Sequence, residues 1–270
     1  MDTKSGHYEY IQYTVEGGVA TILLNRPETR NAFSMGMREE FQAALFSVKA
    51  DNSIKAVVLA GAGKHFCAGG DISTMDPDQT AVGGMQRVQN ARLVVSELIE
   101  FDRPVVAAVD GAAYGAGFGM ALAADFVVAT PRSRMCMAFM RIGLVPDFAV
   151  FYTLPRIVGL QRAKDLIFSG REIGAAEARE MGIVYEIVES ECVLARAQQL
   201  ASSFCNASAP ALSMAKQALN VSMHSDLKTM LMTEAFAQGI AMSSSEHKAA
   251  IQRFVDKAPL LYQWPQRDKD

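Results

Sequence analysis

The chain has 270 residues, of which 50% are hydrophobic, and it carries a formal net charge of −3. These values suit one large globular domain with a sizeable core, and the mild acidity argues against a general nucleic-acid binder. No apolar run reaches the roughly 18 residues of a membrane span, and the N-terminus lacks an apolar signal core. The four cysteines form no C-x-x-C pair, which is typical of reduced thiols in an intracellular protein. We therefore expect a cytoplasmic protein that binds neither nucleic acid nor membrane.

The N-terminal third of the chain alternates between strand and helix patterns. Two strand patterns flank Glu16-Gly17-Gly18, which is a hairpin signal, and a polar loop at 25–32 follows them. Ser34 suits the N-cap of a helix that runs to about Ala50. The patterns further predict strands at 8–13, 19–24 and 54–60, a glycine-rich turn at 61–72, a loose polar stretch at 76–84 and a helix at 86–100.

The stretch 105–125 combines a buried strand, a glycine-rich turn and a helix. Its apolar, β-branched start passes through Gly111, Gly115, Gly117 and Gly119 into good helix formers. The first N–H groups of such a helix have no intrahelical acceptor and lie at the positive end of its dipole, so the turn suits a phosphate or an oxyanion. The spacing matches neither the dinucleotide-binding pattern G-x-G-x-x-G nor the phosphate loop, which favours the oxyanion. The alternative is that the glycines only let the helix pack closely against its strand.

The C-terminal half changes from mixed patterns to helices. Strands are predicted at 126–129, 135–139 and 183–188, a loop at 141–147, and helices at 148–157, 161–169 and 174–181. From 193 to 254 the pattern is almost wholly helical, with a break near 206–210.

The two glycine-rich turns at 64–72 and 113–125 together resemble the enoyl-CoA hydratase/isomerase superfamily, the crotonases. Further landmarks follow in family order and spacing, so that the resemblance covers about 8–261: Asn25-Arg26-Pro27, Phe66-Cys67-Ala68-Gly69-Gly70-Asp71, Pro104-Val105-Val106, Gly143-Leu144-Val145-Pro146 and Leu154-Pro155-Arg156. The resemblance implies an α/β fold, a spiral of ββα units over 1–200, with a helical region at 201–270 that builds a homo-trimer or a dimer of trimers. It implies an acyl-CoA thioester as substrate, whose oxygen the N–H groups of Gly70 and Ala116 would bind. Such backbone donors stabilise the negative charge that develops on a thioester oxygen.

Two positions at which crotonase hydratases carry glutamates are occupied here by Gly119 and Phe139. A hydratase needs one group to activate water and another to protonate the α-carbon, and neither residue can do so. The resemblance therefore argues against ordinary hydration of a 2-enoyl-CoA.

Asp147 follows Gly143-Leu144-Val145-Pro146, where hydratases have a glycine. Dienoyl-CoA isomerases, aromatic dehalogenases and the ring-epoxide isomerases of phenylacetyl-CoA breakdown carry an aspartate there, and this segment most resembles the last branch. That branch usually continues with small residues, whereas this chain has Phe148-Ala149-Val150-Phe151-Tyr152. A dehalogenase also needs a histidine at about 85–90, which this chain lacks. The residues alone favour the alternative, in which Asp147 is a helix N-cap or a loop carboxylate that faces water.

The resemblance also implies a site for coenzyme A. Arg30, Lys64 and Lys257 fall where crotonases present basic residues, and phosphates need such cations. The implied substrate and CoA contacts further include Ala32, Ala68, Gly70, Asp71, Ile72, Ala116, Phe139 and Phe254, the last near the adenine. Ser73 and Glu28 stand where the family has lysines, and the residues themselves favour Asp71 as a helix cap.

Together these features predict an acyl-CoA isomerase with Asp147 as acid and base, which shifts a 3-enoyl to a 2-enoyl double bond or rearranges a ring epoxide. No metal-ligand spacing is present, and we expect no cofactor beyond the coenzyme A of the substrate. The alternatives are a hydratase or acyl-CoA hydrolase that uses other residues, and a silent family member that binds acyl-CoA without turnover.

Overall fold

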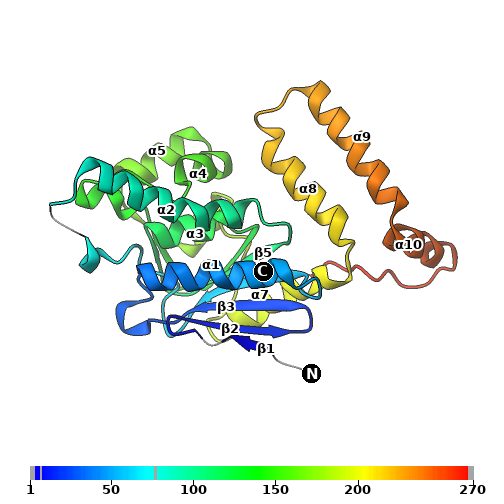
Figure 1. Cartoon of the computed structure of the whole chain (residues 1–270), viewed down its shortest axis with the longest axis horizontal. Coiled ribbons are helices and arrows are strands. Elements are labelled where there is room, and N and C mark those ends of the chain that lie inside the picture. Colours follow the sequence, from blue (N-terminus) through cyan, green and yellow to red (C-terminus); the bar gives the residue numbers. More distant parts are fainter. Residues whose placement is uncertain (1–3, 7, 76–77, 267–270) are drawn as a thin grey trace.

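A seven-stranded sheet lies at the centre of the computed structural model, which describes residues 4–6, 8–75 and 78–266 (Figure 1). β2 is antiparallel to its two neighbours β1 and β3, and the strands from β3 onward run parallel. Parallel strands need crossover connections, and helices supply them here. In spatial order the strands are β1 (Lys4–Gly6), β2 (Ile11–Glu16), β3 (Val19–Leu24), β4 (Ala56–Gly61), β5 (Val105–Val109), β7 (Phe126–Ala129) and β10 (Glu186–Ile187).

A second, three-stranded sheet consists of short strands that the sequence mostly did not reveal. It contains β6 (Ala112–Tyr114), β8 (Arg134–Cys136) and β9 (Glu172–Gly174). The strand predicted at 135–139 is present only as far as Cys136, and a short 3-10 helix occupies Ala138–Ile142. Three residues are too few to show the alternation that identifies a strand.

The main sheet is covered by helices on both faces. α1 (Met35–Ala50), α2 (Ala81–Ile99) and α3 (Ala116–Ala123) enclose the larger apolar core, and α7 (Val193–Ser203) packs on the opposite face of β3, β4, β5 and β7. Burial on both faces explains why β4 and β5 are apolar at every position. The remaining helices of this part are α4 (Val150–Val158), α5 (Leu160–Ser169) and α6 (Ala175–Glu180).

Several predicted boundaries are confirmed and others shift for identifiable reasons. Ser34 caps α1, because its Oγ accepts a hydrogen bond from the Met37 amide at 3.2 Å. α2 begins five residues earlier than predicted, because Thr80 provides a cap in the same way for Gly83 at 3.1 Å. The predicted polar stretch at 76–84 therefore ends at the Thr80 cap, and residues 76–77 lie outside the described residues.

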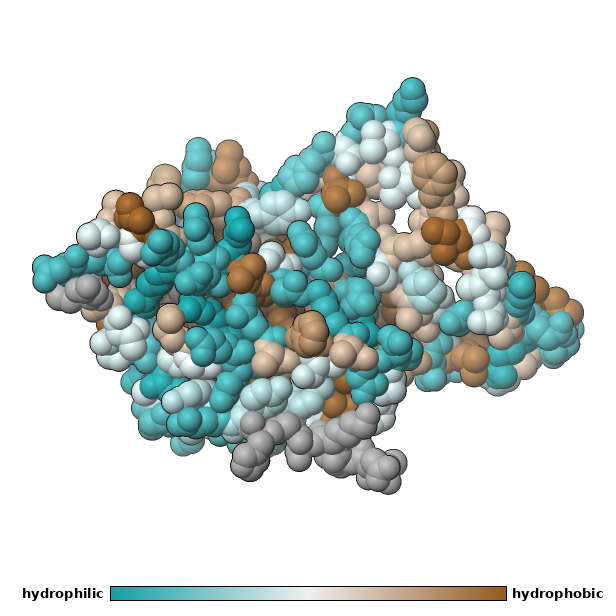
Figure 2. Space-filling view, viewed as in Figure 1, coloured by the Kyte–Doolittle hydropathy of each residue, from teal (hydrophilic) through white to brown (hydrophobic). Residues whose placement is uncertain are grey.

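Three C-terminal helices form an arm that projects from the core (Figure 1). None of the three contains a buried residue, and Figure 2 shows apolar side chains exposed along the arm. The predicted break near 206–210 is confirmed by the short 3-10 helix Phe204–Asn206, while the predicted division at residue 200 falls inside α7. The arm consists of α8 (Ala209–Ser222), α9 (Leu227–Ser243) and α10 (Ser245–Val255).

The arm is attached to the core at both of its ends. At α8, Lys216 forms an ion pair with Asp125 at 2.7 Å, and the Asn220 side chain donates to the Ile99 carbonyl at 2.8 Å. After α10 the chain returns, and the Trp264 ring packs between those of Phe126, Tyr185 and Phe204. No helix in the described part of the chain is long and apolar enough to cross a bilayer.

Candidate active site

The two glycine-rich turns meet in space. Cys67 pairs with the strand β6, because its amide donates to the Ala112 carbonyl and its carbonyl accepts from the Tyr114 amide, each at 2.9 Å. α3 then passes so close that a β-carbon on Gly117 would lie 2.3 Å from the Cys67 carbonyl oxygen. Only glycine permits that approach, so one function of these glycines is the close packing that the sequence left as an alternative.

The same approach brings the amides of Gly70 and Ala116 to one place. Gly69 adopts φ +106°, and a β-carbon there would lie 3.9 Å from the Ala116 nitrogen. Ala116 is the first residue of α3, where amides lack intrahelical acceptors. In the described chain neither the Gly70 nor the Ala116 amide donates to a backbone carbonyl, and the α-carbon of Gly70 faces open space. A free loop N–H beside a free N–H at a helix N-terminus suits a developing oxyanion.

Two residues from the segment after β3 hold the Gly70 turn in place. The buried Asn31 donates to the carbonyls of Ala62 at 2.9 Å and His65 at 2.7 Å. Phe33 flanks Gly70 on both sides, because its amide donates to the Gly69 carbonyl at 2.8 Å and its carbonyl accepts from the Asp71 amide at 3.3 Å. The polar loop predicted at 25–32 is thus the support of the adjacent turn.

Asp147 lies in an apolar environment. Its Oδ1 atom is buried and has no hydrogen-bond partner among the described residues. Burial raises the pKa of Asp147 to about 6, although its own backbone N–H and the charge of Arg87 act in the opposite direction. The helix-cap alternative is wrong, because α4 begins at Val150 with Ala149 at its N-cap and no side chain caps it. A carboxyl with this pKa can both take up and release a proton near neutral pH.

Asp147 lines a pocket of about 880 Å³. Three segments form its wall: one side of α2, the chain from Pro146 to Tyr152, and the last turns of α8. Gly70 and Ala116 do not line it, whereas Phe148 does, and its ring contacts Phe33. Its lining is mostly apolar and includes Val88, Val95, Ile99, Pro146, Phe148, Val150, Phe151 and Val221.

The two positions that lack glutamates are tightly packed. The Phe139 ring lies over Gly115, with its Cζ atom 3.6 Å from the point where a β-carbon would stand. A β-carbon on Gly119 would lie 2.6 Å from the Cβ of Phe148. A side chain at residue 119 would therefore have to displace Phe148, and neither position supplies an acid or a base.

Most of the predicted coenzyme A residues lie around the Gly70 turn. The Ala68 amide donates to the Arg30 carbonyl at 2.9 Å, and the side chains of Arg30 and Lys64 are exposed. Burial first, and then the charges of Arg30 and Arg132, lower the pKa of His65. These two arginines therefore lie near the His65 ring. Ala32 follows Arg30 by two residues, and the exposed Ile72 follows Gly70 by two residues.

Asp71, by contrast, has a structural role as a cap. Its carboxylate accepts from the Ser73 amide and hydroxyl and from Arg26. The Ser73 hydroxyl first, and Arg26 second, lower the pKa of Asp71 below its ordinary value. This confirms the expectation that Asp71 caps the short helix Ile72–Thr74.

Phe254 and Lys257 are not brought to this region by the same chain. Phe254 belongs to the last turn of α10 and Lys257 follows that helix by two residues; α10 lies at the right of Figure 1, whereas the chain before α2 lies at the left. The Phe254 side chain is 77% exposed. A single copy therefore holds only part of the predicted binding set.

Arg87 was not identified from the sequence. It donates to the carbonyls of Thr74 at 3.3 Å and Asp71 at 3.5 Å, and its charge acts on Asp147. Arg87 thus lies between the Gly70 turn and the buried carboxyl. A single arginine in a helix carries no sequence signal of such a position.

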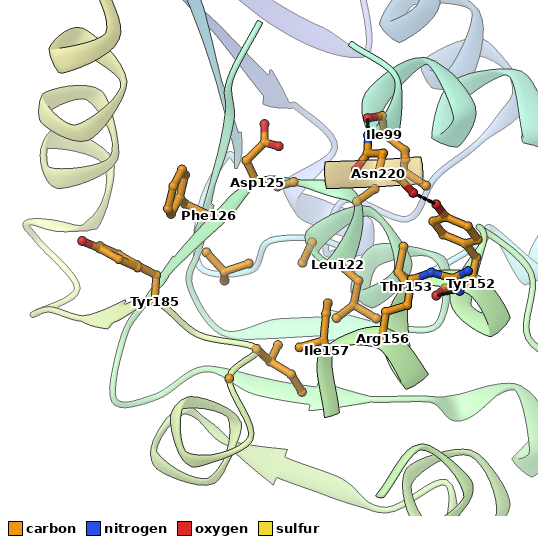
Figure 3. A pocket seen from close by; sticks show the side chains of 16 residues that line it. Ile99, Leu122, Asp125, Phe126, Tyr152, Thr153, Arg156, Ile157, Tyr185 and Asn220 are labelled. Carbon is orange, nitrogen blue, oxygen red and sulfur yellow. Dashed lines mark hydrogen bonds between the residues drawn. The ribbon is translucent and has the colours of Figure 1, made fainter. Parts of the chain in front are cut away.

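A second cavity of about 390 Å³ lies beside α8 (Figure 3). Tyr152 and Asn220 meet on one side of it, where the Tyr152 hydroxyl donates to the Asn220 carbonyl at 2.8 Å, and Phe126 and Tyr185 lie on the other. The Oδ2 atom of Asp125 is occupied by the Val105 amide and Lys216, so this acid is structural. Within the described ranges, no group of three or more His, Cys, Asp and Glu side chains is arranged to hold a metal ion.

Comparisons with known proteins show which family this fold and sequence resemble. A sequence model of the enoyl-CoA hydratase/isomerase family matches residues 14–266. The 1,2-epoxyphenylacetyl-CoA isomerase of Escherichia coli (strain K12) is 35% identical over 252 residues, which cover 92% of this chain and 96% of that protein. A probable enoyl-CoA hydratase of Rhodobacter capsulatus is 34% identical over 252 residues, 93% of this chain and 97% of that protein. The crystal structure of an enoyl-CoA hydratase/isomerase from Cupriavidus metallidurans CH34 superposes with a TM-score of 0.93 at 39% identity, covering 97% of this chain and 100% of that one.

Proposed function

The chain belongs to the enoyl-CoA hydratase/isomerase family, and we propose that within this family it is an isomerase of acyl-CoA thioesters. The reaction moves a double bond from the 3-enoyl to the 2-enoyl position, or rearranges a ring epoxide carried by the acyl group. The similarity to a 1,2-epoxyphenylacetyl-CoA isomerase supports this choice, and the likeness to a probable hydratase keeps hydration as the competing activity.

The buried carboxyl of Asp147 carries the proposal. In a double-bond shift the carboxylate takes a proton from the α-carbon of a 3-enoyl thioester. The electron pair spreads over the dienolate, whose charge rests largely on the thioester oxygen. The protonated carboxyl then returns the proton at the γ-carbon, which gives the 2-enoyl product. One residue performs both transfers, and a pKa of about 6 suits each of them.

The amides of Gly70 and Ala116 would donate hydrogen bonds to the thioester oxygen. Their directions are fixed before the substrate binds, because Phe33 holds the residues on both sides of Gly70 and α3 begins at Ala116. Preorganised donors of this kind stabilise the enolate more than the ground-state carbonyl. The reaction needs no metal or redox group, so we propose that coenzyme A enters only as part of the substrate.

Hydration is disfavoured by the same packing. Gly119 offers no carboxylate, and Phe148 occupies the space into which a longer side chain would extend. Phe139 likewise fills its position with an aromatic ring. Residues 119 and 139 thus supply neither of the two acid–base groups that hydration needs, which leaves Asp147 as a single such group.

We also propose that the arm assembles the protein into a trimer or a dimer of trimers. Its exposed apolar side chains include Leu231 at 53% and Phe236 at 68% exposure, and a contact between copies would remove them from water. In such an assembly α10 of a neighbouring copy would bring Phe254 and Lys257 to a coenzyme A site formed by Arg30 and Lys64.

The decisive experiment is a product analysis with three substrates. The protein is incubated in heavy water with a 3-enoyl-CoA, a 2-enoyl-CoA and the ring epoxide of phenylacetyl-CoA, and products are identified by mass spectrometry. Double-bond migration, with or without deuterium uptake, or epoxide rearrangement supports the isomerase, and Asp147→Asn must lower its rate by at least about 100-fold. Addition of water to the 2-enoyl-CoA would establish a hydratase, release of free coenzyme A a hydrolase, and binding without turnover a silent family member.

A further inference from the structure

The chain directly after Asp147 forms a turn with two residues in a conformation that they rarely adopt. The Val150 amide donates to the Asp147 carbonyl at 3.1 Å and closes the turn. Phe148 has φ +50° and Ala149 has φ +56°, and both lie in the left-handed region. Turns of this kind favour asparagine and glycine, because other side chains are strained there. Surrounding contacts must therefore hold the turn in place.

The first of these contacts is the close packing of the turn against Gly119 of α3. A β-carbon at this position would lie 2.6 Å from the Cβ and 3.2 Å from the carbonyl oxygen of Phe148, and 3.4 Å from a methyl group of Val150. The first distance is shorter than any ordinary contact, and both atoms belong to or adjoin the backbone. The turn can occupy this place only because residue 119 has no side chain.

The second contact joins the turn to the Gly70 loop. The buried Phe148 ring packs edge-to-face on Phe33 with 5.7 Å between ring centroids. Phe33 in turn hydrogen-bonds to the backbone of Gly69 and Asp71. The Phe148 side chain therefore contacts Phe33, which supports the Gly70 amide. The backbone of Phe148 packs on α3, the helix that begins at Ala116.

From these contacts, and resting on the function proposed above, we propose that Phe148 is a positioning residue seated on Gly119. It fixes the direction of the Asp147 carboxyl relative to the amides of Gly70 and Ala116. Phe148 itself exchanges no proton. Its contribution is to keep the neighbouring carboxyl in its buried position against the strain of the turn.

A double-mutant cycle between Gly119 and Phe148 tests this inference. Gly119→Ala pushes the turn outward, and we expect kcat to fall about 100-fold with KM little changed, since a displacement of about 1 Å costs that much. Phe148→Gly removes the blocking β-carbon and relieves the strained φ. In the Phe148→Gly background, adding Gly119→Ala should therefore lower kcat less than about 3-fold. Equal effects of Gly119→Ala in the two backgrounds would overturn the inference.

A second measurement needs no substrate. Carbon NMR of labelled aspartate carboxyl groups, with Asp147→Asn to assign the signal, follows the titration of Asp147 directly. In Gly119→Ala we expect this pKa to fall from about 6 toward its ordinary value as the carboxyl moves to water. The other charged or titratable groups near it are Arg87 and Arg92 on α2, Glu100 directly after α2 and His224 just beyond α8, none of which is altered. An unchanged pKa in Gly119→Ala would contradict the proposed displacement.

The cycle separates this inference from the proposed function. A wild-type protein that isomerises no substrate refutes the function, whereas an active wild type whose Gly119→Ala variant keeps its kcat and its Asp147 titration refutes the inference alone. Alanine is the better helix former, so a destabilised Gly119→Ala would itself reflect the contact with Phe148. If that variant does not fold, Phe148→Ala and Phe148→Gly are compared by NMR. Phe148→Ala keeps the β-carbon that packs against Gly119, so the pKa of Asp147 should be higher in this variant than in Phe148→Gly. Equal pKa values in the two variants would overturn the inference.

Discussion

Arg26 donates from Nη1 to the Oδ2 atom of Asp71 across 2.8 Å, and this bond joins the loop after β3 to the residue that follows Gly70. Both side chains are largely buried, at 20% and 10% exposure. The Gly70 amide therefore depends on an ion pair that lies beside it. Its support can be removed without touching any group proposed to contact the substrate.

We expect Arg26→Met to lower the free energy of unfolding at pH 7 by about 3 kcal/mol, because it leaves the Asp71 carboxylate buried without its cation. The pKa of Asp71 is lowered in the folded protein, so this contribution exists above the unfolded pKa of about 3.9 and disappears as the pH falls below it. Urea unfolding at pH 7 and at acid pH measures the difference. Arg26→Met/Asp71→Asn should recover part of the loss, and equal stability of Arg26→Met and wild type at pH 7 would contradict the expectation.

Gly70→Pro deletes one proposed oxyanion donor. Losing such a donor typically costs about 10²–10³ in kcat, and we expect a loss of this size with the fold retained. Gly70→Ala is the matched control, because it keeps the N–H and its β-carbon would meet no atom within 4 Å. Steady-state kinetics and thermal unfolding of both variants decide the matter. Comparable turnover in the two proteins would exclude the Gly70 amide from catalysis.

Asp147→Asn should lower turnover by about 10²–10⁴, the usual contribution of a general acid–base group. It should also stabilise the protein at pH 8. The folded pKa of about 6 lies above the unfolded value, so wild-type stability falls as the pH rises through this interval. A shift of roughly two pKa units corresponds to about 2–3 kcal/mol, which the variant would retain. Denaturant unfolding at pH 4 and pH 8 should show equal stability at pH 4 and a more stable variant at pH 8; a less stable variant at pH 8 would refute the burial of the charge.

The pH profile of kcat/KM should rise through about pH 6 as Asp147 loses its proton. Arg87 holds the pKa of Asp147 down, so Arg87→Gln should move this limb to higher pH. Arg92→Gln is the comparison, because it removes an equal charge from the wall of the same pocket, whereas the charge that lowers the Asp147 pKa is that of Arg87. If the pH at which kcat/KM rises does not change in Arg87→Gln, or changes equally in both variants, the interaction between Arg87 and Asp147 is excluded.

The sequence was most informative where a local signal has one physical cause. The apolar strands β3 and β7 have the predicted bounds, and Ser34 caps α1 as expected. The resemblance to the crotonases, and the fold that it implies, are confirmed by the family match and by the superposed structure. It also placed the two glycine-rich turns in one site, which Cys67 and Ala113 now join.

The remaining features depend on contacts between distant segments. The strands β6 and β9 have three residues each and form because β8 lies between them. Phe148 and Ala149 are not turn residues by type, and only the absence of a side chain on Gly119 makes their turn possible. The roles of Asp147, Gly70 and Ala116, and the predicted coenzyme A contacts, stay predictions until the variants above are measured.

The double attachment of the arm has a consequence for assembly. α8 is fixed through Lys216 and Asn220, and the chain beyond α10 is fixed through Trp264. The orientation of α9 and α10 is therefore set before any partner binds. Association that covers the apolar side of the arm would lose little conformational freedom within it, and preorganisation of this kind raises affinity.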